Sequence, residues 1–272
     1  MIPLLLEPKD LAKLLQGKSE HDAPLVVDLC QRKNYEQHHI SGAVHVSPRE
    51  LISGDNPAVG KLPTIKNLET LFSRIGYKPE KHIIAYDDEG GGWAGRFLWT
   101  LDVIGHHGSS YLNGGLIAWY KDELPLTRVV PKILRESISL TLKPEFIAEK
   151  EEVLASLKDS NTKIWDARSA EEYNGSKVFA ARGGHIPGAI NLDWLELMDT
   201  GRELRLREDL AELLEAKGLK RANKIITHCQ THHRSGLSYL VGKILGLNIK
   251  AYHGSWAEWG NDLSSPIEKG GA

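Results

Sequence analysis

Residues 225–237 have the sequence IITHCQTHHRSGL, and this stretch decides the fold of the second half of the chain. Its first four residues form an apolar run typical of a short buried strand. After the run, apolar residues recur at the spacing of one helix face, at Leu237, Leu240, Val241, Ile244 and Leu245. A strand that turns through a short polar loop into a helix is typical of a parallel α/β fold. We therefore expect the chemistry in the loop.

Cys229 is the first residue of this loop. A loop that runs into a helix N-terminus directs backbone N–H groups and the positive end of the helix dipole inward, so it attracts anions. In such surroundings the pKa of a cysteine thiol falls from about 8.5 to about 3.5–7.5. The nearby cations are Arg234 and, when protonated, His228, His232 and His233. The stretch therefore predicts a nucleophilic thiolate in an anion-binding loop.

The run CQTHHR, residues 229–234, resembles the active-site loop of the rhodaneses, which are thiosulfate sulfurtransferases. It is most similar to the loop of bacterial members with two tandem domains. Three further motifs extend the resemblance over essentially the whole chain: WDAR at 165–168, GHIPGA at 184–189 and GSW at 254–256. The resemblance implies an α/β protein of two tandem rhodanese-like domains, each a mostly parallel sheet flanked by helices.

An internal repeat also predicts two domains. The run His39-Ile-Ser-Gly-Ala recurs as His185-Ile-Pro-Gly-Ala, and Val26-Val-Asp recurs as Ile164-Trp-Asp. The repeat is far longer than the period of a solenoid, so it indicates a duplicated domain. We assign residues 1–124 to the first domain, 125–137 to a linker and 138–272 to the second domain. We expect His39 at the surface.

The first domain has the same expected pattern of alternating strands and helices. We predict strands at 4–6, 25–28, 82–86 and 110–113 and helices at 9–16, 68–75 and 93–104. Alignment of IIAY (83–86) with IITH (225–228) places Asp87 at the position of Cys229, before the acidic loop DEGGG. We therefore expect the first domain to be inactive and to cover or complete the site of the second.

The resemblance implies a role for each site residue. Cys229 attacks the outer sulfur of thiosulfate, expels sulfite and becomes a persulfide, and a thiophilic acceptor such as cyanide then removes the sulfur. The anion-binding residues are expected to be Gln230, Thr231, His232, His233, Arg234 and Ser235. Asp166 and Arg168 are expected to brace the loop, and Trp194 to line its mouth. We expect no cofactor. We also expect no metal, because the side chains of the adjacent His232 and His233 tend to diverge.

Three alternative functions fit the same cysteine. A 3-mercaptopyruvate sulfurtransferase is expected to have a small, glycine-containing loop, unlike residues 230–233. A persulfide carrier would pass its sulfur to a protein partner. A cysteine phosphatase or arsenate reductase has five residues between its cysteine and arginine, whereas four separate Cys229 from Arg234.

Composition limits the partners. The 272 residues are 41% apolar and 26% charged, with a formal net charge of -2, so neither nucleic acid nor a membrane is expected as a partner. Two cysteines indicate a reducing compartment, and we assign Cys30 a packing role. No signal-peptide pattern or membrane span is apparent. We expect a cytoplasmic monomer that uses a small anionic sulfur donor, thiosulfate, and a thiophilic acceptor: cyanide, a thiol or a protein.

Overall fold

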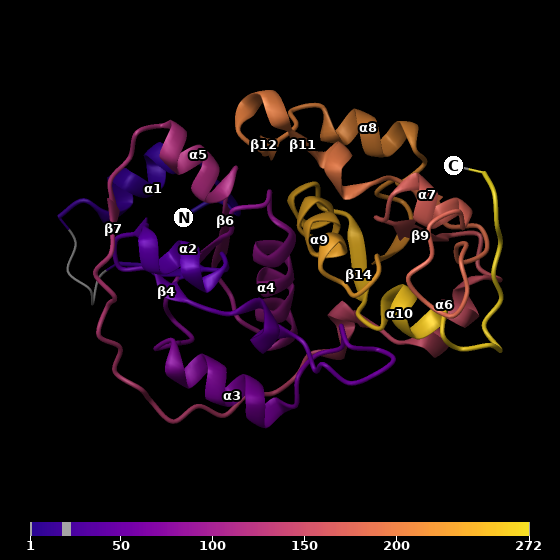
Figure 1. Ribbon diagram of the computed structural model, residues 1–272, viewed down its shortest axis with the longest axis horizontal. Helices are drawn as coiled ribbons and strands as arrows, with labels where there is room; N and C mark the ends of the chain where they lie inside the picture. Colours follow the sequence, from indigo (N-terminus) through magenta and orange to yellow (C-terminus); the bar gives the residue numbers. More distant parts are fainter. Residues whose placement is uncertain (1, 18–22, 272) are drawn as a thin grey trace. The chain divides into compact units, whose positions relative to one another are not determined.

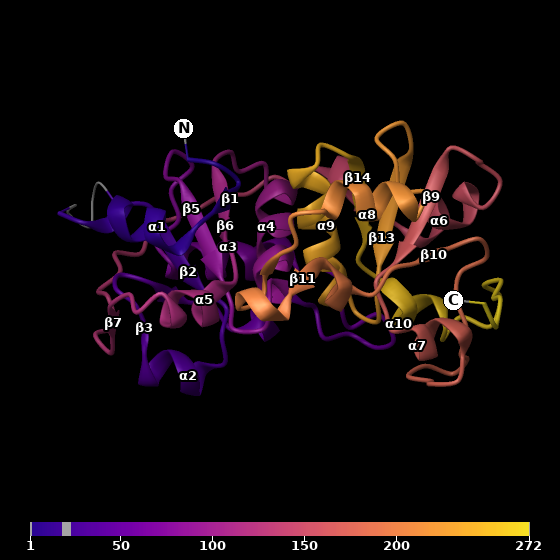
Figure 2. The same ribbon diagram turned by 90° about the horizontal axis from the view of Figure 1, so that it is seen from above.

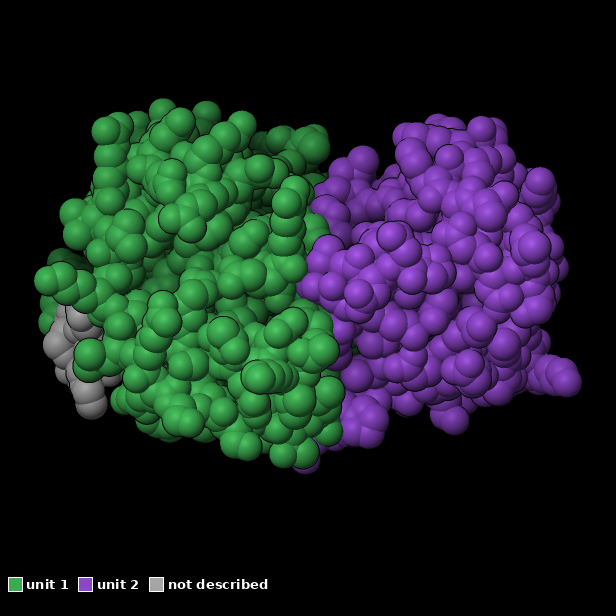
Figure 3. All heavy atoms as spheres, turned by 60° about the horizontal axis from the view of Figure 1, so that its bottom comes forward, with its two compact units in different colours: residues 1–51, 63–142, 198–206 green, residues 52–62, 143–197, 207–272 purple. Residues whose placement is uncertain are grey.

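The computed structural model describes residues 2–17 and 23–271, which form two compact units. Unit 1 contains residues 1–51, 63–142 and 198–206, and unit 2 contains residues 52–62, 143–197 and 207–272 (Figure 3). Each unit therefore takes one short segment from the other half of the chain. We call residues 52–62 and 198–206 the exchanged segments. The predicted ranges 1–124, 125–137 and 138–272 are continuous and do not include this exchange.

The sheet of unit 1 is five-stranded and parallel, in the order β1-β6-β5-β2-β4 (Figures 1 and 2). Every residue of β2 and β5 is buried. Because successive side chains of a strand point to opposite faces, both faces of the sheet are covered. The strands are β1 (Leu5–Leu6), β2 (Leu25–Asp28), β4 (Val44–His45), β5 (Ile83–Tyr86) and β6 (Ser109–Leu112).

Helices cover this sheet through apolar side chains. Leu11 of α1 and Trp119 of α5 join one core cluster with Ile84 of the sheet. The rings of Phe72 in α3 and Phe97 in α4 stack with centroids 5.9 Å apart. The helices of this unit are α1 (Pro8–Leu15), α2 (Arg32–Gln37), α3 (Ile65–Arg74), α4 (Gly92–Val103) and α5 (Gly115–Lys121), with the 3-10 turns η1 (Pro48–Leu51) and η4 (Thr200–Arg202). Two antiparallel pairs complete it: β3 (His39–Ile40) with β7 (Leu126–Thr127), and β11 (Met198–Asp199) with β12 (Arg205–Leu206).

Unit 2 repeats this topology. Its parallel sheet has the order β10-β9-β13-β14-β8, so β13 occupies the place that β5 has in unit 1. The strands are β8 (Ile147–Ala148), β9 (Thr162–Asp166), β10 (Ile190–Asn191), β13 (Lys224–His228) and β14 (Asn248–Tyr252). The helices are α6 (Lys150–Ser156), α7 (Ala170–Asn174), α8 (Leu210–Ala216), α9 (Arg234–Ile244) and α10 (Ser255–Trp259), with the 3-10 turns η2 (Pro144–Phe146) and η3 (Trp194–Leu197). The predicted duplicated α/β fold with mostly parallel sheets is confirmed.

The placement of His39 at the surface is wrong. Its ring is buried and stacks on Tyr35 with centroids 3.9 Å apart, and its Nδ1 lies 2.7 Å from the carbonyl oxygen of the same tyrosine. His185 of unit 2 makes the same contacts with Tyr173, at 3.6 Å and 2.8 Å. A stacked aromatic ring and a carbonyl partner offset the cost of burying imidazole. The repeated HI-x-GA motif therefore holds a buried histidine in each unit.

Within residues 2–17 and 23–271, no helix is both long enough and apolar enough to cross a membrane.

Candidate active site

Cys229 follows the last residue of β13, and five loop residues, 229–233, lead into α9 at Arg234. The strand is a central, almost wholly buried member of its sheet, so the thiol is fixed at the carboxyl end of a rigid element. His232 adopts a φ of 54°, in the left-handed region, which turns the chain sharply into the helix. Its Nδ1 lies 2.7 Å from Oγ of Ser235 in the first turn of α9. The predicted strand, loop and helix are confirmed.

The first residues of α10 hold the first part of this loop. The N–H of Cys229 donates to Oγ of Ser255 (3.4 Å), a buried residue with a φ of 54°. The N–H groups of Trp256 and Ala257 donate to the carbonyl oxygens of Cys229 and Gln230, at 2.9 Å each. These bonds fix the backbone on both sides of the thiol-bearing carbon. The sequence analysis did not assign Ser255 to the site, although its GSW motif was part of the resemblance.

Arg234 is held by Glu172 of α7. Two guanidinium nitrogens donate to the two carboxylate oxygens at 2.6 Å and 2.8 Å. Burial lowers the pKa of Arg234, but the hydrogen bond with Glu172 and the charge at Cys229 outweigh it, so the net shift is upward. Arg234 is 20% exposed and Glu172 only 3%. The arginine is therefore a fixed, permanent cation near the thiol, and Glu172 is a site residue that the sequence analysis missed.

Asp166 and Arg168 form an ion pair inside unit 2. Asp166 ends β9, beside β13, and its Oδ2 lies 2.5 Å from the guanidinium of Arg168. That guanidinium also donates to the carbonyl oxygen of Gly184 (2.8 Å) and lies 4.3 Å above the ring of Trp256. The backbone N–H of Trp256 donates to the carbonyl oxygen of Cys229. The ion pair therefore supports the start of α10, which holds the cysteine. The bracing role expected for Asp166 and Arg168 stays a prediction.

His228 lies beneath the loop as a neutral side chain. It is fully buried, and burial lowers the pKa of its imidazole, although the Asp166 carboxylate 3.7 Å away opposes the shift. Its Nδ1 lies 3.2 Å from the carbonyl oxygen of Cys229. The sequence analysis counted His228 as a cation only when it is protonated, and desolvation disfavours that form.

His233 and His232 point to different surroundings. The ring of His233 lies 5.6 Å from that of Trp194 at the start of η3, and both residues are half-buried. His232 is buried, and its Nδ1 contacts Oγ of Ser235. Within the described ranges, no three His, Cys, Asp or Glu side chains cluster as a metal site would require. Trp194 thus lies against the last residue of the cysteine loop, and its expected place at the mouth of the loop stays a prediction.

The exchanged segment 52–62 comes from the first half of the chain and contacts the cysteine loop in the second half. A Cβ atom on Gly60 would lie 2.1 Å from the carbonyl oxygen of Thr231, so the two backbones touch. Lys61 binds Glu149 (3.2 Å) and Glu258 (2.8 Å). The N–H of Leu62 donates to Nδ1 of His253 (3.2 Å). The part of the chain assigned to the first domain therefore helps to build the surroundings of Cys229.

The corresponding loop of unit 1 carries a carboxylate in place of the thiol. Asp87 follows β5, is fully buried and accepts N–H bonds from Glu89, Gly91 and Ala94 at 3.3, 2.8 and 3.0 Å. Burial is the main cause that raises the pKa of Asp87 to about 6. Helix α4 begins at Gly92, as far after Asp87 as Arg234 is after Cys229. The loop of unit 1 therefore binds its own side chain.

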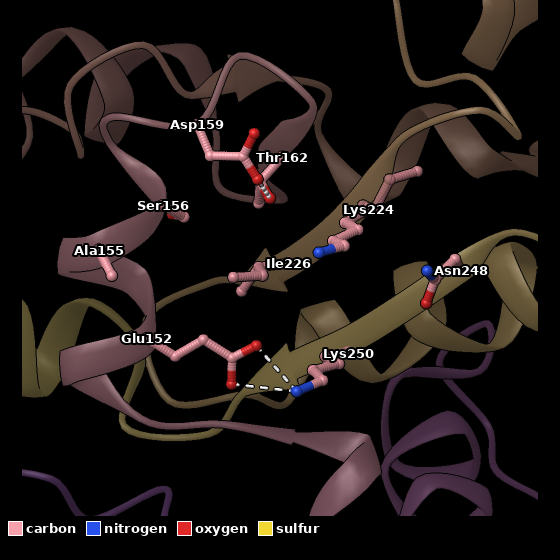
Figure 4. A pocket seen from close by; sticks show the side chains of 10 residues that line it. Glu152, Ala155, Ser156, Asp159, Thr162, Lys224, Ile226, Asn248 and Lys250 are labelled. Carbon is pink, nitrogen blue, oxygen red and sulfur yellow. Dashed lines mark hydrogen bonds and ion pairs between the residues drawn. The ribbon is translucent and has the colours of Figure 1, made fainter.

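A cavity of about 410 Å³ lies elsewhere in unit 2. Its lining includes Glu152 of α6, Lys224 at the start of β13 and Asn248 and Lys250 of β14, and Lys250 pairs with Glu152 at 2.8 Å (Figure 4). These strand residues lie at or near the amino ends, whereas Cys229 follows the carboxyl end of β13. The cavity is therefore not the surroundings of the thiol.

The family model of the rhodanese-like domain matches twice, at residues 7–122 and 149–262. The thiosulfate sulfurtransferase of Pseudomonas aeruginosa is 49% identical over 268 residues, which cover 98% of this chain and 97% of that protein. The thiosulfate sulfurtransferase of Azotobacter vinelandii is 47% identical with the same coverage. The crystal structure of YnjE has the same fold, with a TM-score of 0.87 at 21% identity over 99% of this chain and 69% of that one.

Proposed function

Because the chain belongs to the rhodanese-like domain family, we propose that it transfers sulfane sulfur from thiosulfate to a thiophilic acceptor through a persulfide on Cys229. One observation carries the proposal: Cys229 begins a short loop at a strand's carboxyl end, beside a permanently charged arginine. A thiolate is the nucleophilic form of cysteine, and nearby positive charge favours it.

The reaction has two displacements. In the first, the thiolate sulfur of Cys229 bonds to the outer sulfur of thiosulfate, and the sulfur–sulfur bond of the donor breaks. Sulfite leaves with that electron pair, and the persulfide keeps one negative charge. In the second, a nucleophile such as cyanide attacks the outer persulfide sulfur, thiocyanate leaves and the thiolate returns. No electrons or protons are needed from elsewhere, so we propose that no cofactor or metal takes part.

In this proposal the chain's residues have separate tasks. Oγ of Ser255, which accepts from the N–H of Cys229, and the N–H groups of Trp256 and Ala257 hold the backbone around the reacting sulfur, which preserves the alignment that displacement needs. The Arg234 guanidinium provides positive charge for the anionic donor and for the negative persulfide. Asp166 and Arg168 act at a distance by bracing Trp256.

We place the reaction in the cytoplasm and expect the chain to act as a monomer. Both cysteines are buried and unpaired, as in a reducing compartment. The sulfur acceptor is cyanide, a small thiol or a protein.

A steady-state assay with three substrates tests the proposal. The wild-type protein is expected to form thiocyanate from thiosulfate and cyanide faster than from 3-mercaptopyruvate and cyanide, and to leave an aryl phosphate intact. Cys229→Ser removes the nucleophile and should abolish thiocyanate formation, whereas Cys30→Ser is the matched control and should retain it. Preferred turnover of 3-mercaptopyruvate, or phosphate release that depends on Cys229, would overturn the assignment.

A further inference from the structure

The exchanged segment 52–62 reaches the cysteine loop at a single glycine. Gly60 is buried, and a Cβ atom at this position would lie 2.1 Å from the carbonyl oxygen, 2.6 Å from the carbonyl carbon and 2.8 Å from Cα of Thr231. Real Cβ atoms essentially never come this close to other heavy atoms, and backbone cannot rotate away as a flexible side chain can. The φ of Gly60 lies outside the left-handed region, so contact is what excludes a side chain here.

The segment is anchored to the rest of unit 2 directly after this contact. After Gly60, Lys61 pairs with Glu149 and Glu258, and the N–H of Leu62 donates to His253. Within the segment, Ser53 donates its N–H to the carbonyl oxygen of Lys61 (2.8 Å). Gly60 therefore cannot move away from Thr231 without breaking these bonds.

The loop is thus held from two directions. The start of α10 binds the carbonyl oxygens of Cys229 and Gln230, and Gly60 stands against the carbonyl group of Thr231. Unit 1 shows the reciprocal arrangement, because a Cβ atom on Gly90 of its own loop would lie 2.5 Å from Sδ of Met198, in the other exchanged segment. In each unit, an exchanged segment lies on the loop that follows the equivalent strand.

We propose that Gly60 is a positioning residue for sulfur transfer: it fixes the path of the loop after Cys229, and with it the alignment of the thiolate toward the donor sulfur. The inference rests on the proposed function. It assigns Gly60, in the half of the chain that lacks Cys229, a direct part in placing the reacting group.

The experiment compares Gly60→Ala with Gly54→Ala. Gly54 lies in the same segment with a φ of 77° and no atom within 4 Å of an added Cβ, so its variant adds backbone strain without touching the loop. Gly60→Ala must displace the loop, and a misplacement of about 1 Å can cost about 100-fold in rate. We expect the single-turnover release of sulfite from thiosulfate to fall about 100-fold in Gly60→Ala and to stay near the wild-type rate in Gly54→Ala.

A third variant, Lys61→Met, loosens the anchor without filling the contact. It should slow sulfite release less than Gly60→Ala does, and it keeps the test valid if Gly60→Ala does not fold. Thermal unfolding of each variant separates a lower rate from a lower folded fraction. The inference is overturned if Gly60→Ala releases sulfite at the wild-type rate, if Lys61→Met has no effect, or if Gly54→Ala is slowed as much as Gly60→Ala. An inactive wild-type protein would instead refute the proposed function.

Discussion

At the scale of single residues, the two cysteines differ in the charges that surround them and not in burial. Both thiols are buried, Cys30 at 0% exposed and Cys229 at 1%. Burial raises the pKa of Cys30, and the negative charges of Asp28 and Asp88 raise it further, so that thiol stays protonated. Cys229 instead lies beside Arg234. The sequence analysis assigned Cys30 a packing role and Cys229 the nucleophilic role, but the negative charges of Asp28 and Asp88 around Cys30 emerge only from the structure.

The Arg234–Glu172 pair provides a prediction that separates structure from chemistry. Arg234→Ala should slow sulfite release and also lower the free energy of unfolding, by about 1–3 kcal/mol, because Glu172 is left buried without its partner. The double variant Arg234→Ala/Glu172→Ala should regain part of that stability but none of the rate. Urea unfolding and single-turnover sulfite release measure the two effects.

Lys224→Ala is the control for this pair, since it removes a cation at the opposite end of β13. It should change neither quantity by much. Recovery of the sulfite-release rate in the double variant would mean that Arg234 acts only by neutralising Glu172. That result would contradict the proposed role of Arg234 in binding the anionic donor.

At the scale of elements, local sequence patterns predicted the strand, loop and helix. They did not predict contacts between residues far apart in the sequence. The apolar run of β13 and the helical spacing of α9 are both properties of neighbouring residues. The neighbouring sequence does give Glu172 a role, as the partner of Ser169 in a capping box at the start of α7. Nothing in its neighbourhood indicates that it also binds Arg234. Ser255 and Gly60 escaped for the same reason, because their partners lie in other elements.

The anchor of segment 52–62 should be sensitive to acid. A hydrogen bond from His253, aided by the charge of Lys61, lowers the pKa of Glu149 to about 2, against about 4.3 for an unperturbed glutamate. A lowered folded-state pKa contributes stability that is present above about pH 4.3 and is lost as pH falls towards 2. We therefore expect the wild-type protein to lose more unfolding free energy between pH 5 and pH 3 than Glu149→Gln does.

Urea titrations of both proteins at the two pH values measure this difference. The effect should be modest, because the Glu149 side chain is 53% exposed and water screens its ion pairs. Parallel losses in the two proteins would show that Glu149 does not anchor the segment through its charge.

At the scale of the whole molecule, the sequence predicted the duplication but not the exchange of segments. Repeated motifs such as HI-x-GA can be aligned without a structure. The unit on which a loop packs depends instead on long-range contacts, such as those of Lys61 and Gly60 in unit 2. Residues 52–62 and 198–206 therefore looked like ordinary loops of the halves in which they occur.

Unit 1 should remain inactive even when it is given a thiol. In Asp87→Cys, the new side chain would lie beside Asp88 and Glu89, with Gly92 at the position of Arg234, so the thiolate is disfavoured. Loss of the carboxylate also leaves the N–H groups of Gly91 and Ala94 without their acceptor. We expect peptide mass spectrometry after thiosulfate treatment to find added sulfur on Cys229 and none on residue 87. Sulfur on both residues would show that the fold alone activates a cysteine at this position.

The central claim is that Cys229 carries the sulfur, and intact mass spectrometry after brief treatment with thiosulfate tests it most directly. The wild-type protein and Cys30→Ser should each gain the mass of one sulfur atom, release one sulfite per chain and lose the added mass when cyanide is supplied. Cys229→Ser should gain nothing. Added sulfur on Cys229→Ser, or release of sulfite and formation of thiocyanate by a wild-type protein that never gains the mass, would contradict the account.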